Sequence, residues 1–306
     1  MRCSRGISTR QPTTGSIDFS TTPGLDVFQW KRSQDVKYYV HLLHSADIAD
    51  YEMFGVDFYD SILLGAEHQE ANVRELEELR GETSKELYYI GVPYWDELLK
   101  RINENRADSN TKRTILIAPS WGARSKLLKQ YGERIIDELL ENGYHVILRP
   151  HPQSFRSEIS LIQRFESRYG DKIEWNRDTD NFNVLNRADI MISECSGVVY
   201  DFACVFDKPV ICLNSEPELG VYDVSWLKKT QYWTLDSLSE VGEILTEGNL
   251  SDLNAMINRC LTDDKYSNKR KQLRDETWVY QGEGAVKASD YLIEKYNKLA
   301  FGEESV

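Results

Sequence analysis

The chain has 306 residues, of which 41% are hydrophobic and 28% charged, and its formal net charge is −13. These fractions are typical of a globular protein in water, and the length allows two domains with a core each. The negative charge argues against nucleic acid as a partner and against a broad basic surface for membranes.

No signal of membrane insertion or secretion is visible. The longest apolar runs fall short of the roughly 18 residues that a membrane-spanning helix needs, and the N-terminal residues lack the apolar segment of a secretory signal. The five cysteines are odd in number and form no CxxC pair. This usage favours a reducing compartment, so we expect a cytoplasmic protein.

The first third of the chain alternates apolar runs with helical spacing. Residues 1–22 are rich in Ser, Thr, Arg and Gly without a period, and are predicted to be irregular or the remnant of a larger element. Expected strands are Val36–Leu43, Tyr59–Leu64 and Leu87–Ile90, and expected helices are Glu67–Arg80, which Gly81 would end, and Trp95–Ile102. The polar stretch 103–113 is predicted to link two domains.

The rest of the chain alternates strand and helix more regularly. Strands are predicted at 114–118, 145–150, 172–175, 189–194 and 209–213, with helices at 127–140, 157–169, 181–187 and 198–206. From about residue 236 onward the pattern is mostly helical, and the last helix, Ala285–Leu299, is expected to pack back across the first domain.

This alternation on both sides of one linker predicts an α/β fold with two Rossmann-like domains facing a cleft. The expected domains are a short or truncated one at 1–105 and a second at 112–282, followed by the crossing helix within 283–306. In such sheets, ligands bind beyond the carboxyl ends of the strands. The residues expected there are Ser120, Trp121, Gly122, Arg149, His151, Ser193, Ser196 and Gly197, a set that suits a phosphorylated ligand.

Two of these strand ends carry distinct chemistry. The Ser193–Gly197 loop leads into a helix, where free N–H groups favour an anion, although an ordinary turn with a serine cap fits equally well. Asp201 lies one turn further, within reach of a ribose hydroxyl or simply exposed. Two prolines stiffen the loop around His151, and Arg149 offers a planar fork for phosphate oxygens. The alternative for His151 is a solvent-exposed loop histidine.

The remaining histidines and acids divide into one candidate and several structural groups. His44 ends an early strand and is a candidate base facing the phosphate site. His41 is expected to be packed, and His68 and His145 to be structural or exposed. Asp178 and Asp180 resemble a metal-binding acidic pair, but a helix cap explains Asp180 better. No metal or cofactor motif is present, so none is expected.

Several ordered motifs resemble one family. P-S-W-G, R-P-H-P, A-D-I-M-I-S-E-C-S-G-V-V-Y-D-F-A and K-P-V-I-C-L-N are similar to the C-terminal signature of the CDP-glycerol glycerophosphotransferases, which build wall teichoic acids and related polyol-phosphate polymers. H-S-A-D at 44–47 and G-V-P-Y-W-D at 91–96 resemble the family's N-terminal motifs, and G-E-G-A-V-K-A-S-D at 282–290 is a weaker match. The similarity spans about Pro23 to Leu213.

The resemblance implies a glycosyltransferase-B-type fold with an acceptor-side first domain and a nucleotide-donor second domain. Glycerol phosphate, or a related polyol phosphate, would move from CDP-glycerol to a hydroxyl of a membrane-linked teichoic-acid-like or capsular polymer, releasing CMP. His44 would be the base, Arg149 and His151 would hold the donor pyrophosphate, and Ser193, Ser196 and the loop amides would hold phosphate or ribose. The protein would then sit on the inner face of the membrane.

The sequence also departs from the family pattern. S-E-C-S-G stands where the family usually has T-D-Y-S-S, and H-S-A replaces H-G-T, so the donor or acceptor can differ. One alternative is therefore a nucleotide-sugar glycosyltransferase or epimerase of the same fold, in which Glu216 or Glu218 binds sugar hydroxyls. Another, motivated by the short first domain, is a truncated nucleotide-binding domain without catalysis.

Overall fold

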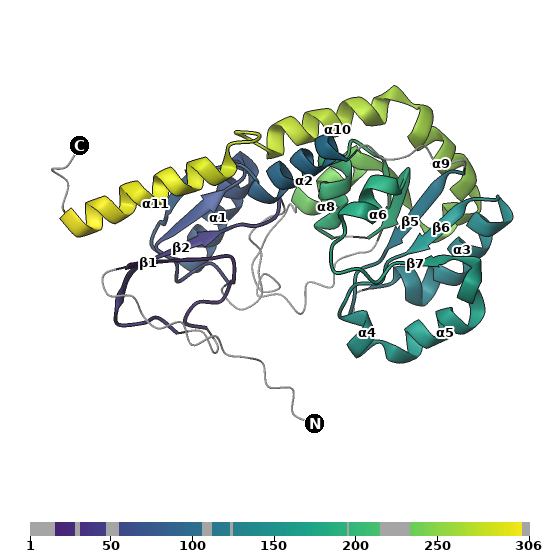
Figure 1. Ribbon diagram of the computed structural model, residues 1–306, viewed down its shortest axis with the longest axis horizontal. Helices are drawn as coiled ribbons and strands as arrows, with labels where there is room; N and C mark the ends of the chain where they lie inside the picture. The colour runs from purple at the N-terminus through teal and green to yellow at the C-terminus, as the bar shows by residue number, and fades with distance from the viewer. Residues whose placement is uncertain are drawn as a thin grey trace.

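A computed structural model describes residues 16–27, 31–46, 55–105, 112–122, 125–194, 196–214 and 233–301. Two parallel sheets organise these residues (Figure 1). The first has four strands in the order β1-β2-β3-β4, and the second has six in the order β10-β9-β8-β5-β6-β7.

The first sheet contains β1 (Ser16–Ser20), β2 (Val36–Leu42), β3 (Ser61–Leu64) and β4 (Glu86–Tyr89), with helices α1 (Glu67–Arg80) and α2 (Pro93–Glu104). Helix α1 ends as expected at Gly81, which adopts φ 67° in the left-handed region. The prediction that residues 1–22 are irregular is wrong for β1, which pairs in parallel with β2. Its alternating Ile17 and Phe19 pack beside the apolar cluster under α11 (Gly284–Phe301), a long-range contact that composition does not reveal.

The second sheet contains β5 (Thr114–Ala118), β6 (His145–Leu148), β7 (Glu174–Trp175), β8 (Ile190–Ser193), β9 (Val210–Leu213) and β10 (Gly242–Leu245). Its helical segments are η1 (Leu127–Tyr131), α3 (Gly132–Glu141), α4 (Ser154–Ser157), α5 (Ile159–Tyr169), η2 (Gly170–Lys172), α6 (Phe182–Arg187), α7 (Val198–Tyr200), η3 (Asp201–Val205), α8 (Trp233–Val241), η6 (Glu247–Asp252), α9 (Leu253–Thr262) and α10 (Asp264–Thr277). Both sheet faces are covered: Leu116 of β5 lies in one buried cluster, whereas Ile115 and Ile117 lie in the other. This double burial explains the continuous apolar runs.

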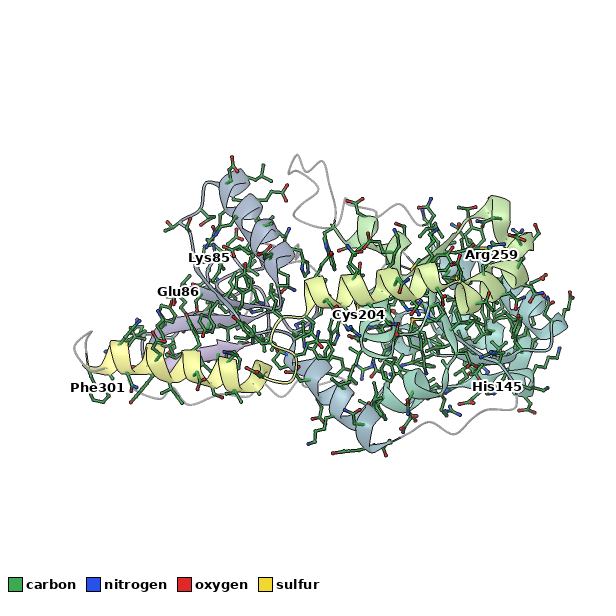
Figure 2. All side chains as sticks on the ribbon, turned by 90° about the horizontal axis from the view of Figure 1, so that it is seen from above. Lys85, Glu86, His145, Cys204, Arg259 and Phe301 are labelled. Atoms are coloured by element: carbon green, nitrogen blue, oxygen red, sulfur yellow. The ribbon has the colours of Figure 1, made fainter. Side chains whose placement is uncertain are left out.

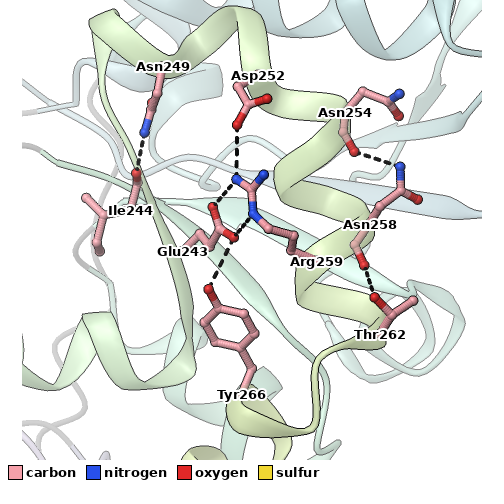
Figure 3. A network of polar contacts seen from close by, with 9 residues as sticks. All are labelled: Glu243, Ile244, Asn249, Asp252, Asn254, Asn258, Arg259, Thr262 and Tyr266. Carbon is pink, nitrogen blue, oxygen red and sulfur yellow. Dashed lines mark hydrogen bonds and ion pairs between the residues drawn. The ribbon is translucent and has the colours of Figure 1, made fainter.

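Strand β10 was missed, because G-E-I-L is too short to interrupt a mostly helical pattern. A Cβ added at Gly242 would lie 1.8 Å from the carbonyl oxygen of Val210, so only glycine lets β10 approach β9 here. Arg259 then ties the strand to the helices that follow (Figure 3). Its guanidinium pairs with Glu243 through both carboxylate oxygens, at 2.6 and 2.8 Å, and with Asp252 at 3.0 Å.

Helix α11 returns to the first sheet, where Ala288 and Tyr291 pack against Val40, Leu63 and Ile90. Lys295 also forms an ion pair with Glu86 of β4. Figure 2 shows α11 running beside the first sheet to Phe301, with His145 and Arg259 at the other end of the molecule. The C-terminal helix therefore shares its core with the N-terminal sheet. None of the helices in the described ranges is both long and apolar enough to cross a bilayer.

Asp96 in α2 fixes the turn from which α11 starts. Its carboxylate accepts hydrogen bonds from the indole N–H of Trp278 at 3.0 Å and from the backbone N–H groups of Gly282 and Gly284 at 2.7 and 2.9 Å. Two motifs far apart in the sequence, G-V-P-Y-W-D and G-E-G-A-V-K-A-S-D, are thus joined by one carboxylate.

We expect Asp96→Ala to lower the free energy of unfolding by about 2–3 kcal/mol, because buried donors are left without an acceptor. The indole of Trp278 is 2% exposed, so water does not replace the lost partner there. Urea denaturation measures the change. Glu97→Ala is the matched control, because Glu97 is an exposed neighbour on the same helix. Equal stability of the two variants would contradict the role of Asp96.

Candidate functional site

The sheet order places the loops after β5, β6 and β8 next to one another, at the carboxyl ends of these strands. Strand β5 lies between β6 and β8 and is parallel to both. The connection after β5 leads to β6 on one side, whereas the connection after β8 leads to β9 on the other side. The gap between β5 and β8 is therefore a topological switch point, where ligands bind in such sheets. The residues predicted at the ends of these strands are consequently neighbours.

A buried carboxylate that the sequence analysis did not single out holds the loop after β5. Glu194 is 2% exposed. Its oxygens accept hydrogen bonds from Ser120 N at 3.1 Å, Ser125 Oγ at 2.7 Å, Lys126 N at 3.0 Å and Leu127 N at 3.3 Å. These donors satisfy a charge that would otherwise be costly to bury. The position of Glu194 directly after a buried strand was the sequence signal that could have identified it. Its carboxylate positions the loop after β5.

The loop that Glu194 fixes carries Trp121 and Gly122. Trp121 is 45% exposed, and its ring stacks on the imidazole of His151 with centroids 5.5 Å apart and planes at 19°. Gly122 adopts φ 82°, a conformation that favours glycine, and its carbonyl accepts a hydrogen bond from Lys129 Nζ at 2.6 Å. Trp121 therefore reaches the loop after β6, whereas Ser120 is bound to Glu194 at the end of β8.

His151 is held in one tautomer. Its Nδ1 accepts a hydrogen bond from the backbone N–H of Gln153 at 3.1 Å, so the neutral ring carries its proton on Nε2. Burial, together with the charge of Arg149, lowers the pKa of His151 below its ordinary value of 6.5. At neutral pH the ring is thus an uncharged donor through Nε2.

Arg149 is half-buried and anchored on one side. Nη1 donates to Oδ1 of Asn176 and, at 2.8 Å, to the carbonyl oxygen of Asp178. Burial lowers the pKa of the guanidinium, which nevertheless stays cationic at neutral pH. Nε and Nη2 have no partner among the residues that the structure describes, so the guanidinium can still bind an anion.

The loop after β8 meets the predictions only in part. Ser193 is fully buried, and its hydroxyl donates to the carbonyl oxygen of Ala118 at 2.6 Å. The expectation that Ser193 contacts a ligand is therefore corrected, because this hydroxyl joins β8 to β5. Ser196 and Gly197 are half-buried, and α7 begins without a side-chain cap. A Cβ added at Gly197 would lie 3.7 Å from Oγ of Ser45, which brings the first sheet to this loop.

Asp201 is neither exposed nor free of partners. Its Oδ1 accepts a hydrogen bond from the indole N–H of Trp95 at 2.7 Å, which joins η3 to α2. Burial raises the pKa of Asp201 to about 7. Oδ2 has no partner within the described part of the chain, so this oxygen remains available to a ligand.

We expect Asp201→Asn to stabilise the protein most at high pH. A raised pKa means that the stability present in full below the ordinary value of 3.8 is lost as pH rises toward about 7, and asparagine does not ionise. Melting temperatures compared in acidic and alkaline buffer should separate variant and wild type only in the alkaline one. Asp180→Asn is the control of opposite sign, because its hydrogen bond with Arg101 lowers the pKa of Asp180.

His44 lies just after the carboxyl end of β2. Its side chain is partly exposed, and the burial of the rest of the imidazole lowers its pKa below 6.5. Since Ser45 lies beside Gly197, His44 is brought close to the loop after β8. His41 is fully buried 4.7 Å from the ring of Tyr59, and burial lowers its pKa to about 3, as expected of a packed residue.

The acidic pair has structural partners. Asp180 Oδ1 accepts from the N–H of Phe182, the first residue of α6, at 2.9 Å, and Oδ2 pairs with Arg101 at 2.6 Å. Asp178 accepts at Oδ2 from the amide of Asn176 at 2.9 Å. Asp180 thus bonds the first N–H of the helix as expected, but the residue at the N-cap position of α6 is Asn181. Glu216 and Glu218, the residues of the nucleotide-sugar alternative, lie outside the described residues.

Comparisons with known proteins agree with the family motifs. Residues 56–294 match the family described as CDP-Glycerol:Poly(glycerophosphate) glycerophosphotransferase. The structure of the wall teichoic acid polymerase TagF aligns at a TM-score of 0.53 and 15% identity, covering 87% of this chain and 69% of that chain. A histidine-to-alanine variant of TagF aligns at 0.57 and 14%, covering 92% and 74%. No curated protein matches.

At these identities, the likeness to solved structures shows the fold alone. The expected α/β fold of glycosyltransferase-B type is confirmed, with its parallel sheets. The resemblance read from the motifs is confirmed as well, and the matched region includes β3 through most of α11.

Proposed function

Because the chain belongs to the CDP-glycerol:poly(glycerophosphate) glycerophosphotransferase family and is therefore a transferase, we propose that it moves glycerol phosphate from CDP-glycerol to a polymer hydroxyl, releasing CMP. Three contacts carry the proposal: Gly197 lies beside Ser45, the neighbour of His44; Glu194, just before the Ser196–Gly197 loop, binds Ser120; and Trp121, next to Ser120, stacks on His151.

The donor is assigned to the second sheet. Arg149 offers Nε and Nη2 to the pyrophosphate, and His151 offers the N–H at Nε2. Ser196 and the amides of its loop bind phosphate or ribose, and Asp201 accepts a ribose hydroxyl at Oδ2. A TagF variant solved with CDPG, which aligns at a TM-score of 0.55, supports a donor of this class.

The chemistry follows from this placement. The acceptor hydroxyl oxygen attacks the phosphorus atom that carries glycerol, and its proton passes to His44. The bond from that phosphorus to the bridging oxygen breaks, and the electron pair leaves with CMP. The guanidinium of Arg149 and the Nε2–H of His151 stabilise the charge that develops on the phosphoryl oxygens.

We assign the acceptor to the side of the first sheet, where His44 stands. A membrane-linked teichoic-acid-like or capsular polymer fits the family, and the likeness to a wall teichoic acid polymerase supports this class of acceptor. Such an acceptor places the protein peripherally on the inner face of the cell membrane. A related polyol phosphate is compatible with the same phosphate contacts.

The test measures CMP release from CDP-glycerol with and without a lipid-linked glycan acceptor. Acceptor-dependent release supports the proposal. Folded protein that binds CDP but releases no CMP with any polyol-phosphate acceptor would refute it. UDP-sugars in place of CDP-glycerol are the control, and turnover of these alone would establish the nucleotide-sugar alternative.

A further inference from the structure

The loop that carries His44 is held from behind by the first turn of α1. The side-chain amide of Gln69, which is fully buried, donates through Nε2 to the carbonyl oxygen of Ser45 at 2.8 Å. The Oε1 of Gln69 accepts from the backbone N–H of Gly65 at 2.6 Å, which fixes the orientation of the amide. Gln69 therefore secures one carbonyl group directly after His44.

His68 secures the next carbonyl group. Its Nε2 lies 2.7 Å from the carbonyl oxygen of Ala46, and because a carbonyl only accepts, Nε2 carries the proton. Nδ1 is buried and has no hydrogen-bond partner among the described residues. Burial lowers the pKa of His68 to about 4, so the ring is neutral at physiological pH. Such a ring serves as a fixed donor and is not suited to proton transfer.

The same imidazole connects the His44 loop to the second sheet through stacked rings. His68 stacks on Trp233 with centroids 4.0 Å apart and planes at 23°. Trp233 stacks in turn on Tyr200, at 5.2 Å and 28°. Tyr200 is 1% exposed, belongs to α7 directly after the Ser196–Gly197 loop, and donates its hydroxyl to the carbonyl oxygen of Thr234 at 2.8 Å.

Two site loops from different sheets are thus joined by one chain of contacts, which runs from Ala46 through His68 and Trp233 to Tyr200. We propose that His68, through Ala46 on one side and Trp233 on the other, is a positioning residue that sets His44 against the Ser196–Gly197 loop. The relative placement of acceptor base and donor phosphate is then determined by α1 and α8, in addition to the covalent linker. This role rests on the proposed function, in which His44 and that loop act on one phosphoryl group.

The kinetic test compares His68→Phe and His68→Leu with wild type. Phenylalanine retains a ring to stack on Trp233 but loses the bond to Ala46, and leucine loses both. We expect kcat for acceptor-dependent CMP release to fall at least about 10-fold in His68→Leu and less in His68→Phe, because small displacements of reacting groups are costly. The Kd for CDP-glycerol should not change, because the assigned donor contacts lie on the second sheet and Tyr200 keeps its own hydrogen bonds to Thr234 and Ser237 in both variants.

His145→Leu is the matched control, since His145 lies at the start of β6 beside Glu174 and should not alter kcat. An unchanged kcat in both His68 variants would overturn the proposal. A parallel loss of donor binding would do so too, because it would indicate a general structural role. Should the leucine variant fail to fold, His68→Phe alone decides between these outcomes.

A second readout does not depend on turnover. The chain has five histidines, so the titration of each imidazole can be followed by NMR after isotope labelling. We expect the pKa of His44 to rise toward 6.5 in His68→Leu, because the loop no longer holds it against the protein. His41, the titratable neighbour of His44, has a pKa of about 3 and stays neutral in this range.

The two readouts separate two kinds of failure. If wild type lacks transferase activity but the titration of His44 shifts as expected, the proposed function fails and the positioning role of His68 is supported. If wild type is active and neither kcat nor the titration of His44 responds to the His68 variants, the positioning role of His68 is refuted and the proposed function is supported.

Discussion

His151→Ala is expected to lower acceptor-dependent CMP release at least about 100-fold, the scale of a lost group that stabilises transition-state charge. The hydrogen bond from Gln153 to Nδ1 presents Nε2–H to the ligand, and the adjacent guanidinium of Arg149 acts on the same anion. Alanine removes the donor and also leaves the exposed ring of Trp121 without its stacking partner. Steady-state kinetics with CDP-glycerol measures the change.

Two variants separate these contributions. Trp121→Ala removes the stacked ring and keeps the imidazole, so its loss of rate should be much smaller than that of His151→Ala. His145→Ala, at the start of β6 beside Glu174, should match wild type. If His151→Ala turns over CDP-glycerol as fast as His145→Ala does, His151 has no part in binding or charge stabilisation.

The second sheet is the part of the fold that sequence predicts best. Runs such as T-I-L-I-A and A-D-I-M-I-S are apolar on both faces, because the strands of this sheet are covered from both sides. Their order around β5 explains why residues from separate motifs, such as Trp121 and His151, become neighbours. A local pattern suffices for β5, β8 and β9, in which every residue is buried.

The missed elements depend on long-range partners. Strand β1 lies in a polar, serine-rich context and is stabilised by pairing with β2, whereas β10 depends on the close approach that Gly242 permits. Side-chain direction is similarly hidden from sequence. Ser193 and Glu194 are adjacent, yet their side chains have different roles. The hydroxyl of Ser193 binds β5 within the sheet, whereas the carboxylate of Glu194 holds the loop after β5. Motif spacing identified this segment without showing which side chains bond within the fold.

His44→Ala is expected to abolish most transfer, again by at least about 100-fold, while leaving donor affinity unchanged. The reason is location: His44 lies just after β2 of the first sheet, whereas the assigned donor contacts come from the second. Titration calorimetry with CDP-glycerol should therefore give the same Kd for variant and wild type. A loss of donor affinity equal to the loss of rate would show that His44 binds the nucleotide and is not the base.

The pH dependence of the rate tests the same assignment from another side. A base must be deprotonated to accept the hydroxyl proton, and the pKa of His44 is lowered by its surroundings from 6.5. The rate should consequently rise with pH along a limb whose midpoint lies below 6.5, and be level at neutral pH. Because the pKa of His151 is lowered as well, the limb alone does not identify the group. The slow residual activity of His151→Ala should keep the limb, whereas that of His44→Ala should lose it and increase when imidazole is added as a replacement base.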